Sequence, residues 1–393
     1  MQEITLLNLL LLLVIIYFYE KEKDYKILFA LPPLFCFWAN VHGGFLIGIF
    51  LLFFWLGIKI SEKIISRTKI ARFFDIDQKI TWKNLLIFSL FSFLAIAATL
   101  INAYGIELYS FLADYRNNFY MTHIAEWLPA FFYPINYPKL FYSSLVTAVF
   151  IIDIINLAAK KQKVNLWPAA LILLFFFLSF KSQRHYPLFF IVSFPYLISS
   201  AVRLLDWPLG NLSWLKNNLM VKFYAVAGLV LATIILFLQT NWTNTPFTNP
   251  KFCQSYPCQA VEFLKSHPEY SRLKIFNRYG WGGFLIWVWP EKKLFIDGRL
   301  PQYRLGEHTF LEEYYDFFDE EKSQEKLNHY NIGLILLPIE KPPKLNWFDK
   351  YVFGLKMENF KIPTKHLLNY LNNAPGWKLI YKDKVSLIYA RHN

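Results

Sequence analysis

The chain has 393 residues, of which 55% are hydrophobic and 20% aromatic, and its formal net charge is +13. This composition excludes a disordered, collagen-like or disulfide-dense secreted chain. Residues 1–240 contain 20 Lys and Arg and residues 241–393 contain 21, so neither half concentrates the positive charge. Since the apolar residues also come in long runs, we expect a membrane protein and no nucleic-acid partner.

Eight apolar runs in residues 1–240 predict an α-helical polytopic membrane domain. A hydrocarbon core about 30 Å thick needs about 20 helical residues, and several runs are shorter than that. The second run contains Pro32 and Pro33 and leads into WANVHGG, residues 38–44, where we expect two short helices joined by a tight polar turn. The runs are 4–19, 27–38, 44–58, 84–104, 141–157, 166–180, 186–204 and 221–238.

The loops between these runs differ in charge. If the loops alternate sides, one set contains 16 Lys and Arg and the other set contains four. The positive-inside rule places the first set in the cytoplasm. The outer set is then 39–43, 105–140 and 181–185, and the C-terminal domain also lies outside. The same count places the N-terminus outside, so we expect further helices encoded upstream of Met1.

Two charged features of the membrane domain have competing interpretations. Asp153 lies inside an apolar run near Lys160 and Lys161, so we expect it to snorkel or to pair with a lysine rather than to act in catalysis. The basic loop 59–83 fits an interfacial helix on the inner leaflet and fits a plain cytoplasmic loop equally well.

The outer loops hold the first group of candidate site residues. His42 fits a turn histidine beside two glycines and also a ligand for phosphate or metal. Arg184 and His185 stand at the membrane boundary, where an arginine can bind a lipid phosphate bidentately. Glu126 and Asp114, in the long loop 105–140, are weak candidates for a catalytic base or for metal ligands, and no metal-ligand spacing accompanies them.

A polar linker near residue 241 begins a second domain, residues 241–393, which we expect to be a small α/β domain. Cys253 and Cys258 are close enough in sequence to form a small disulfide loop, although the residues leave their bonding open. We expect helices at 257–266, 281–288, 307–319, 322–330 and 363–373. We expect strands at 273–277, 293–297 and 332–337, and a hairpin at 377–382 and 385–390.

Polar side chains follow two of these strands. In α/β sheets ligands bind beyond the carboxyl ends of strands, so we take Asn277, Trp281, Asp297 and Arg299 as candidate substrate-binding residues. Glycines at 280, 282 and 283 permit a tight turn into a helix N-terminus that can hold an anion. The alternative is a structural turn in which Asp297 and Arg299 pair with each other and cap a helix.

Together these segments resemble bacterial multi-spanning membrane proteins related to the GT-C glycosyltransferases. The resemblance runs from about residue 27 to the end, and its most specific part is FNRYGWGGFLIW followed by LFIDGR. WANVHGG, the EW-P loop at 126–129 and RHYPLF at 184–189 contribute less. It implies an enzyme of the bacterial cytoplasmic membrane that takes sugar from a polyprenyl-phosphate donor on the outer face. The sequence identifies no cofactor, and the resemblance is compatible with a divalent metal.

The resemblance also has a gap. In GT-C enzymes the catalytic acidic residue usually lies in the first outer loop, and the sequence has no such loop. The chain therefore looks like the C-terminal part of such an enzyme, a split gene product with an upstream-encoded partner subunit, or a degenerate relative. The alternative is a non-catalytic membrane protein whose outer domain binds a glycan or a partner subunit. A transporter or flippase is disfavoured, because only Asp153 lies at membrane depth and no repeat is visible.

Overall fold

The computed structural model describes residues 2–114, 119–132, 134–159, 163–205, 252–299, 303–340, 342–360 and 363–392. The chain divides into two compact units. The first consists of Met1–Asn117 and Met121–Ser213, and the second of Asn118–Tyr120 and Trp214–Asn393. The boundary predicted at residue 240 and the apolar run 221–238 lie outside the described residues.

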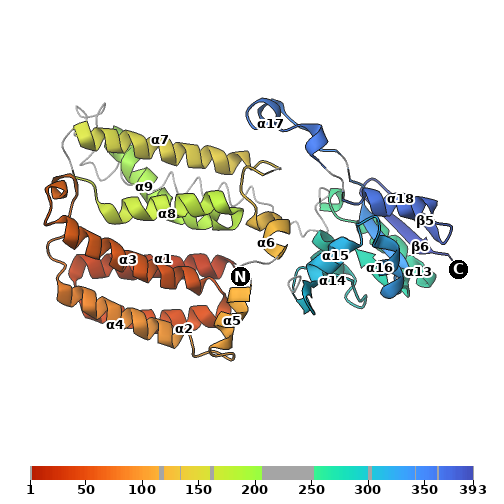
Figure 1. Ribbon diagram of the computed structural model, residues 1–393, viewed down its shortest axis with the longest axis horizontal. Helices are drawn as coiled ribbons and strands as arrows, with labels where there is room; N and C mark the ends of the chain where they lie inside the picture. Colours follow the sequence, from red (N-terminus) through yellow and green to blue (C-terminus); the bar gives the residue numbers. More distant parts are fainter. Residues whose placement is uncertain are drawn as a thin grey trace, which may run out of the picture. The chain divides into compact units, whose positions relative to one another are not determined.

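The first unit is helical, and Figure 1 shows its long helices lying side by side. Among the residues that the structure describes, three helices are long and apolar enough to cross a membrane, over Glu3–Glu22, Phe45–Ile65 and Tyr137–Leu157. The elements in chain order are α1 (Gln2–Glu22), η1 (Tyr25–Ala30), α2 (Leu31–Val41), α3 (Phe45–Ile65), η2 (Lys69–Phe73), α4 (Trp82–Ala98), α5 (Glu107–Asp114), α6 (Phe119–His123), η4 (Ala125–Trp127), α7 (Tyr137–Ala159), α8 (Leu166–Lys181), η5 (Gln183–His185) and α9 (Tyr186–Leu205).

These helices carry apolar side chains on their outer surfaces as well as in their core. Leu86, Phe141 and Phe177 are each about 70% exposed, whereas Trp38 and Trp55 are completely buried between helices. A helix that is hydrophobic all round belongs in a protein core or in a lipid bilayer. The exposed apolar surface is therefore compatible with membrane association.

Prolines and glycines determine how α2 and α3 pack. Pro32 and Pro33 occupy the first turn of α2, where a missing N–H costs no helical hydrogen bond. The predicted polar turn follows at His42–Gly44, and α3 begins at Phe45. A Cβ atom on Gly48 would lie 2.6 Å from the Trp38 ring, so only glycine lets α2 and α3 approach this closely.

The basic loop 59–83 differs from both predictions made for it. Helix α3 continues through Ile65, so the first part of the predicted loop is helical and belongs to a candidate membrane span, and Lys59 is buried in it. Only the short η2 and a single-bridge pairing of Phe74 with Val164 follow before α4. The charged Lys59 side chain can be buried in this helix because it forms ion pairs with two carboxylates, Glu20 at 2.7 Å and Glu62 at 3.2 Å.

The second unit contains a four-stranded sheet with helices packed around it. The strand order is β1-β4-β6-β5; β1 and β4 are parallel, and β6 is antiparallel to both of its neighbours. The elements are η6 (Phe252–Gln254), α12 (Cys258–Ser266), α13 (Pro268–Ser271), β1 (Ile275–Asn277), η7 (Tyr279–Trp281), α14 (Gly282–Val288), β2 (Arg304–Leu305), β3 (His308–Thr309), α15 (Phe310–Asp316), α16 (Ser323–His329), β4 (Leu334–Pro338), α17 (Trp347–Tyr351), η8 (Met357–Asn359), α18 (Lys365–Asn373), β5 (Trp377–Lys382) and β6 (Ser386–Arg391).

Most elements predicted for this unit are present within a few residues, and Cys253 is bonded to Cys258. The strand predicted at 293–297 is wrong. The Asn277 side chain accepts a hydrogen bond from the Phe295 amide at 3.0 Å and donates one to the Ile296 carbonyl at 2.8 Å. One buried amide thus satisfies backbone groups that a strand would pair through a ladder.

Candidate functional site

The outer loops of the first unit meet at one end of its helices. Lys139 donates to the Gln183 side chain at 3.0 Å, and Arg184 pairs with Glu126 at 3.7 Å. At the same end Thr5 is hydrogen-bonded to His42 at 2.8 Å. The three loops that alternation assigned to one side therefore do lie together. We call His42, Glu126, Trp127, Arg184 and His185 the Arg184 cluster.

His42 is held as a neutral hydrogen-bond donor. Its Nδ1 accepts from the Gly44 amide at 2.9 Å, and Trp38 Nε1 donates to Thr5 Oγ1 at 3.2 Å. Because Nδ1 accepts the Gly44 amide hydrogen it carries no proton, and the ring proton of the neutral imidazole is on Nε2. Burial lowers the pKa of His42, and the charge of nearby Arg184 lowers it further.

Gly44 makes this arrangement possible. A Cβ atom at position 44 would lie 2.7 Å from Thr5 Cγ2 and 3.0 Å from His42 Nδ1. Thr5 is β-branched and has little rotamer freedom in a helix, so it cannot move aside at low cost. The sequence WANVHGG therefore sets the position of the imidazole, not only the turn.

Arg184 is fixed by contacts between two loops. Ser182 Oγ accepts from the Arg184 amide at 3.3 Å and donates to the Glu126 carbonyl at 3.0 Å. The Arg184 guanidinium lies 4.7 Å from the Trp127 ring centroid, a cation–π distance. Its side chain is 27% exposed and that of Glu126 is 66% exposed. Arg184 thus keeps a fixed position while its charge stays accessible.

Two buried polar atoms of the cluster have no hydrogen-bond partner within the described part of the chain. They are Trp127 Nε1 and His185 Nδ1, and the two rings lie 6.4 Å apart. Burial lowers the pKa of His185, with the Leu178 carbonyl acting in the opposite sense. Buried polar atoms without partners are rare and costly, so a site containing two of them is suited to a ligand that supplies the missing bonds.

Glu126 is the acidic candidate that reaches this cluster. Asp114 is the last residue of α5, and the position of its carboxylate lies outside what the structure describes. Among the described residues, no three His, Cys, Asp or Glu side chains gather as a metal site would require. Since the Glu126 carboxylate faces a guanidinium rather than other acidic ligands, these residues do not fit a divalent metal, and we assign no step to one.

Asp153 has partners of its own in the helices. It accepts hydrogen bonds from Tyr196 at 2.8 Å and from Ser200 at 2.5 Å, both on α9. Lys160 and Lys161, its predicted partners, lie outside the described residues. The carboxylate joins α7 to α9 at the end away from the Arg184 cluster, and its pairing with a lysine stays a prediction.

In the second unit, two candidate site residues are occupied by internal bonds. Asn277 is fully buried and uses its amide on Phe295 and Ile296. Trp281 is 4% exposed and donates to the Ser255 carbonyl at 3.1 Å. Neither side chain presents a free polar group to a ligand, so we assign both to holding the fold.

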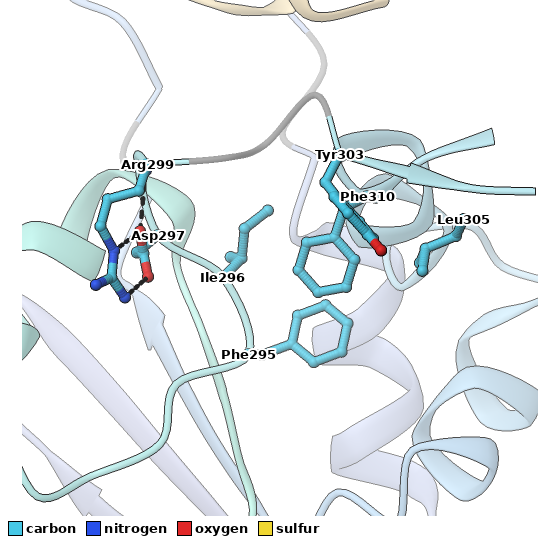
Figure 2. Close-up of a pocket in the computed structure, with 7 residues that line it drawn as sticks. All are labelled: Phe295, Ile296, Asp297, Arg299, Tyr303, Leu305 and Phe310. Carbon is cyan, nitrogen blue, oxygen red and sulfur yellow. Dashed lines mark hydrogen bonds and ion pairs between the residues drawn. The ribbon is translucent and has the colours of Figure 1, made fainter. Parts of the chain in front are cut away.

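Asp297 and Arg299 pair with each other, as the structural alternative predicted (Figure 2). Arg299 donates from Nε at 2.9 Å and from Nη2 at 2.8 Å, and these bonds hold the pKa of Asp297 below its usual value. The pair caps no helix. A Cβ atom on Gly282 would lie 2.6 Å from Asp297 Cα, so backbone fills the space before α14, where an anion had been predicted.

The pair stands at one side of a cavity of about 420 Å³. Figure 2 shows Phe295 and Phe310 together on the other side, with Tyr303 and Leu305 beyond them. The two phenylalanine rings stack at 5.2 Å. This surface is mainly apolar, and its one charged pair is mutually neutralised, so it offers little to a sugar or a phosphate.

Sequence reasoning missed Thr5, Trp127, Lys139, Ser182 and Gln183 as parts of the outer cluster. Four of them lie in a loop of the outer set, for which the alternation of loops was the available signal, whereas Thr5 lies in α1 and had no such signal. Side-chain pairing across loops requires the fold and could not be read from spacing. The sequence matches no protein-family model and no curated protein, so geometry has to support any functional assignment.

Proposed function

We propose that the chain acts in a GT-C-like membrane glycosyltransferase and that the Arg184 cluster binds the phosphate of a polyprenyl-phosphate sugar. One observation carries the proposal: Glu126, Arg184 and His42, from three separate loops, share one end of the helical unit. This end joins an accessible cation, a neutral imidazole donor and a carboxylate, the set that transfer from a phosphate donor needs.

The phosphate would bind where Arg184 now contacts Glu126. An exposed ion pair of 3.7 Å contributes about 0–1 kcal/mol, whereas a guanidinium binds phosphate through two parallel hydrogen bonds. A phosphate can therefore displace the carboxylate. Trp127 Nε1 is buried beside Arg184 and, in the described residues, has no partner, so a ligand oxygen that reaches it would find a further donor.

The displaced carboxylate supplies the remaining chemistry. The bond between the anomeric carbon and the phosphate oxygen breaks, and a bond from the acceptor hydroxyl oxygen to that carbon forms. The hydroxyl proton passes to Glu126, and the negative charge of the leaving phosphate is balanced by Arg184 and by the His42 Nε2–H. Arg184 would thus release the base when it binds the donor.

Two further observations support an orientation. The inner set of loops contains 16 Lys and Arg against four in the outer set, which favours the outer face of a bacterial cytoplasmic membrane for the Arg184 cluster. The Cys253–Cys258 disulfide supports an oxidising, extracytoplasmic location for the second unit.

The proposal is tested by binding and transfer with the full chain in nanodiscs. Undecaprenyl phosphate is titrated against wild type, Arg184→Ala and Lys181→Ala, a control that removes a cation at the exposed end of α8. We expect Arg184→Ala to weaken binding about tenfold or more, as for loss of a charged hydrogen bond, and Lys181→Ala to change it little. Equal losses would contradict the assignment of Arg184.

Transfer of radiolabelled sugar from polyprenyl-phosphate donors is then measured with and without any upstream-encoded protein. Transfer by the chain alone identifies a complete enzyme. Transfer only in the mixture identifies a split enzyme whose partner completes the site. If phosphate binds and neither arm transfers sugar, the glycosyltransferase proposal is rejected in favour of a non-catalytic binding protein.

A further inference from the structure

A second recess in the C-terminal unit lies away from the Asp297–Arg299 pair. It has a volume of about 670 Å³ and lies between α16, α18 and the strands β5 and β6, which Figure 1 labels near the C-terminus. We call it the amide groove. Its main polar and aromatic lining residues are Gln324, Asn328, Asn369, Asn373, Trp377 and Arg391.

The amide groove lies at one end of the strands of the sheet, and the ligand site predicted from the sequence lies at the opposite end. Leu334, where β4 begins, pairs with Ala390 near the end of β6, and Trp377 pairs with Arg391. The carboxyl ends of β1 and β4 are at the opposite end of the sheet, where Asn277 ends β1. The amide groove is therefore a separate site, and no strand–loop motif marked it in the sequence.

The walls of the groove are built from side-chain amides. Gln324 and Asn328 lie on α16 and Asn369 and Asn373 on α18, and all four are exposed. Each amide has one acceptor oxygen and two N–H donors, so neighbouring amides can bind hydroxyl groups as donors and as acceptors at once. Asparagine is a weak helix former, so helix stability alone does not account for its abundance in α18.

The base of the groove is rigid and aromatic. Trp377 is 8% exposed, and the Arg391 guanidinium lies 5.4 Å from its ring centroid. Arg391 is also hydrogen-bonded to Asn328 Oδ1. Tyr370, half-buried on α18, adds a second ring with a hydroxyl. Amphipathic rings beside fixed polar groups suit the alternating C–H and O–H faces of a sugar.

The charges of the groove disfavour an anionic ligand. Arg391 contributes a positive charge and Glu320 a negative one, and His366 lies 3.4 Å from Glu320. Nucleic acid or a phosphate would require an excess of cations, which this lining does not provide. A neutral ligand rich in hydroxyl groups matches both the balanced charge and the amides.

We propose that the amide groove binds a neutral oligosaccharide, either free or attached to a lipid carrier. Its volume is in the range that holds a drug-sized ligand, which corresponds to a short saccharide. The inference goes beyond the proposed transferase, because the groove lies in the other unit and its binding requires no transfer reaction.

The test titrates the full chain in nanodiscs with the neutral tetrasaccharides chitotetraose, maltotetraose and cellotetraose, using saturation-transfer NMR and calorimetry. The variant is Asn369→Ala/Asn373→Ala, and the matched control is Gln259→Ala, an amide on α12 outside the groove. Alanine improves helix propensity in α18, so loss of binding cannot be ascribed to unfolding.

We expect at least one tetrasaccharide to bind and the double variant to weaken it about tenfold, as for the loss of two hydrogen bonds. A second arm presents the bound glycan on a polyprenyl carrier. Binding of the free glycan identifies a soluble source, and binding of the carrier form alone, still lost in the double variant, identifies a lipid-linked source. If no probe binds in either form, or the double variant binds as wild type does, the proposal is overturned. Failure of sugar transfer with binding intact rejects only the transferase.

Discussion

The two ends of the helical unit use similar charged residues in opposite ways. At one end Lys59 lies between Glu20 and Glu62, Trp55 donates to Glu20 at 3.0 Å, and Lys23 pairs with Asp77. We call these residues the Lys59 network. The Lys59 side chain is 5% exposed and that of Glu62 is 3% exposed, so the central pair is closed to solvent.

At the other end, the Arg184 cluster has one long ion pair, accessible charge and buried polar atoms without partners in the described residues. The charges of a buried, fully paired network are already bonded to each other and do not bind a ligand. Removing one of its members destabilises the fold. A cluster whose ion pair is exposed to solvent, as that of Arg184 with Glu126 is, can exchange this contact for a ligand. Burial of the ion pairs, rather than the presence of charge, therefore distinguishes the Lys59 network from the solvent-accessible Arg184 cluster.

The largest effect is expected from Glu126→Gln in the Arg184 cluster. Removing the charge abolishes the proposed base, so sugar transfer should fall about 10²- to 10⁴-fold. Binding of undecaprenyl phosphate should stay equal or increase, because Arg184 loses its competing carboxylate. Both quantities are measured with the full chain in nanodiscs, using the upstream protein where transfer needs it.

Glu107→Gln, an exposed acidic residue in the first turn of α5, is the control for this measurement. It should leave transfer and binding near the wild-type values. A Glu126→Gln protein that transfers sugar at the wild-type rate would show that the base lies elsewhere.

At the end that contains the Lys59 network, Lys59→Met should destabilise the helical unit whether or not a ligand is present. The substitution leaves Glu62 buried without its cation, which costs about 3–5 kcal/mol in the free energy of unfolding. Lys69→Met, at an exposed position in η2, should change stability by less than about 0.5 kcal/mol. Thermal denaturation in detergent compares the two, and similar midpoints would mean that the Lys59 network is not a structural element.

Between the two ends, Gly48→Ala should loosen the packing of α2 against α3. Its Cβ would meet the Trp38 and Phe35 rings at 2.6 and 2.9 Å, an overpacking that costs about 1–3 kcal/mol. Gly57 lies on the same helix, and a Cβ atom there would have no neighbour within 4 Å, so Gly57→Ala should leave stability unchanged or higher. If both variants melt together, close helix approach is not what Gly48 provides.

Local patterns predicted much of this fold. Hydrophobic runs identified the long helices, and alternation with a short turn placed the β5–β6 hairpin within one residue, but the run 27–38 did not show that α2 begins only at Leu31, just before Pro32 and Pro33. These features depend on neighbours in sequence, which a single sequence contains. The strand expected at 293–297 failed because Asn277, about 20 residues earlier, satisfies that backbone.

The sequence predicted which loops form the candidate site, but not which of their side chains pair with each other. Loop alternation grouped His42, Glu126 and Arg184 on one side, and the structure places them together. It could not distinguish Asp297, which Arg299 pairs at 2.8 Å, from Glu126, whose ion pair with Arg184 is 3.7 Å long and exposed. The amide groove was missed because its residues come from two helices and two strand ends, with no motif linking them.

The smallest effect concerns the protonation of His185 in the Arg184 cluster and its influence on stability. The pKa of His185 is lowered by burial, so between that value and the unfolded value of about 6.5 the unfolded chain binds more protons than the folded one. Stability is then complete above about pH 6.5 and declines as the pH falls below it. The thermal midpoint should therefore drop between pH 7.5 and pH 5.5, and His185→Phe should make this drop shallower. His123→Gln, at an exposed position, should keep the wild-type slope. Identical slopes for wild type and His185→Phe would mean that the imidazole is not kept neutral by burial, and the Arg184 cluster would then hold a second cation beside Arg184.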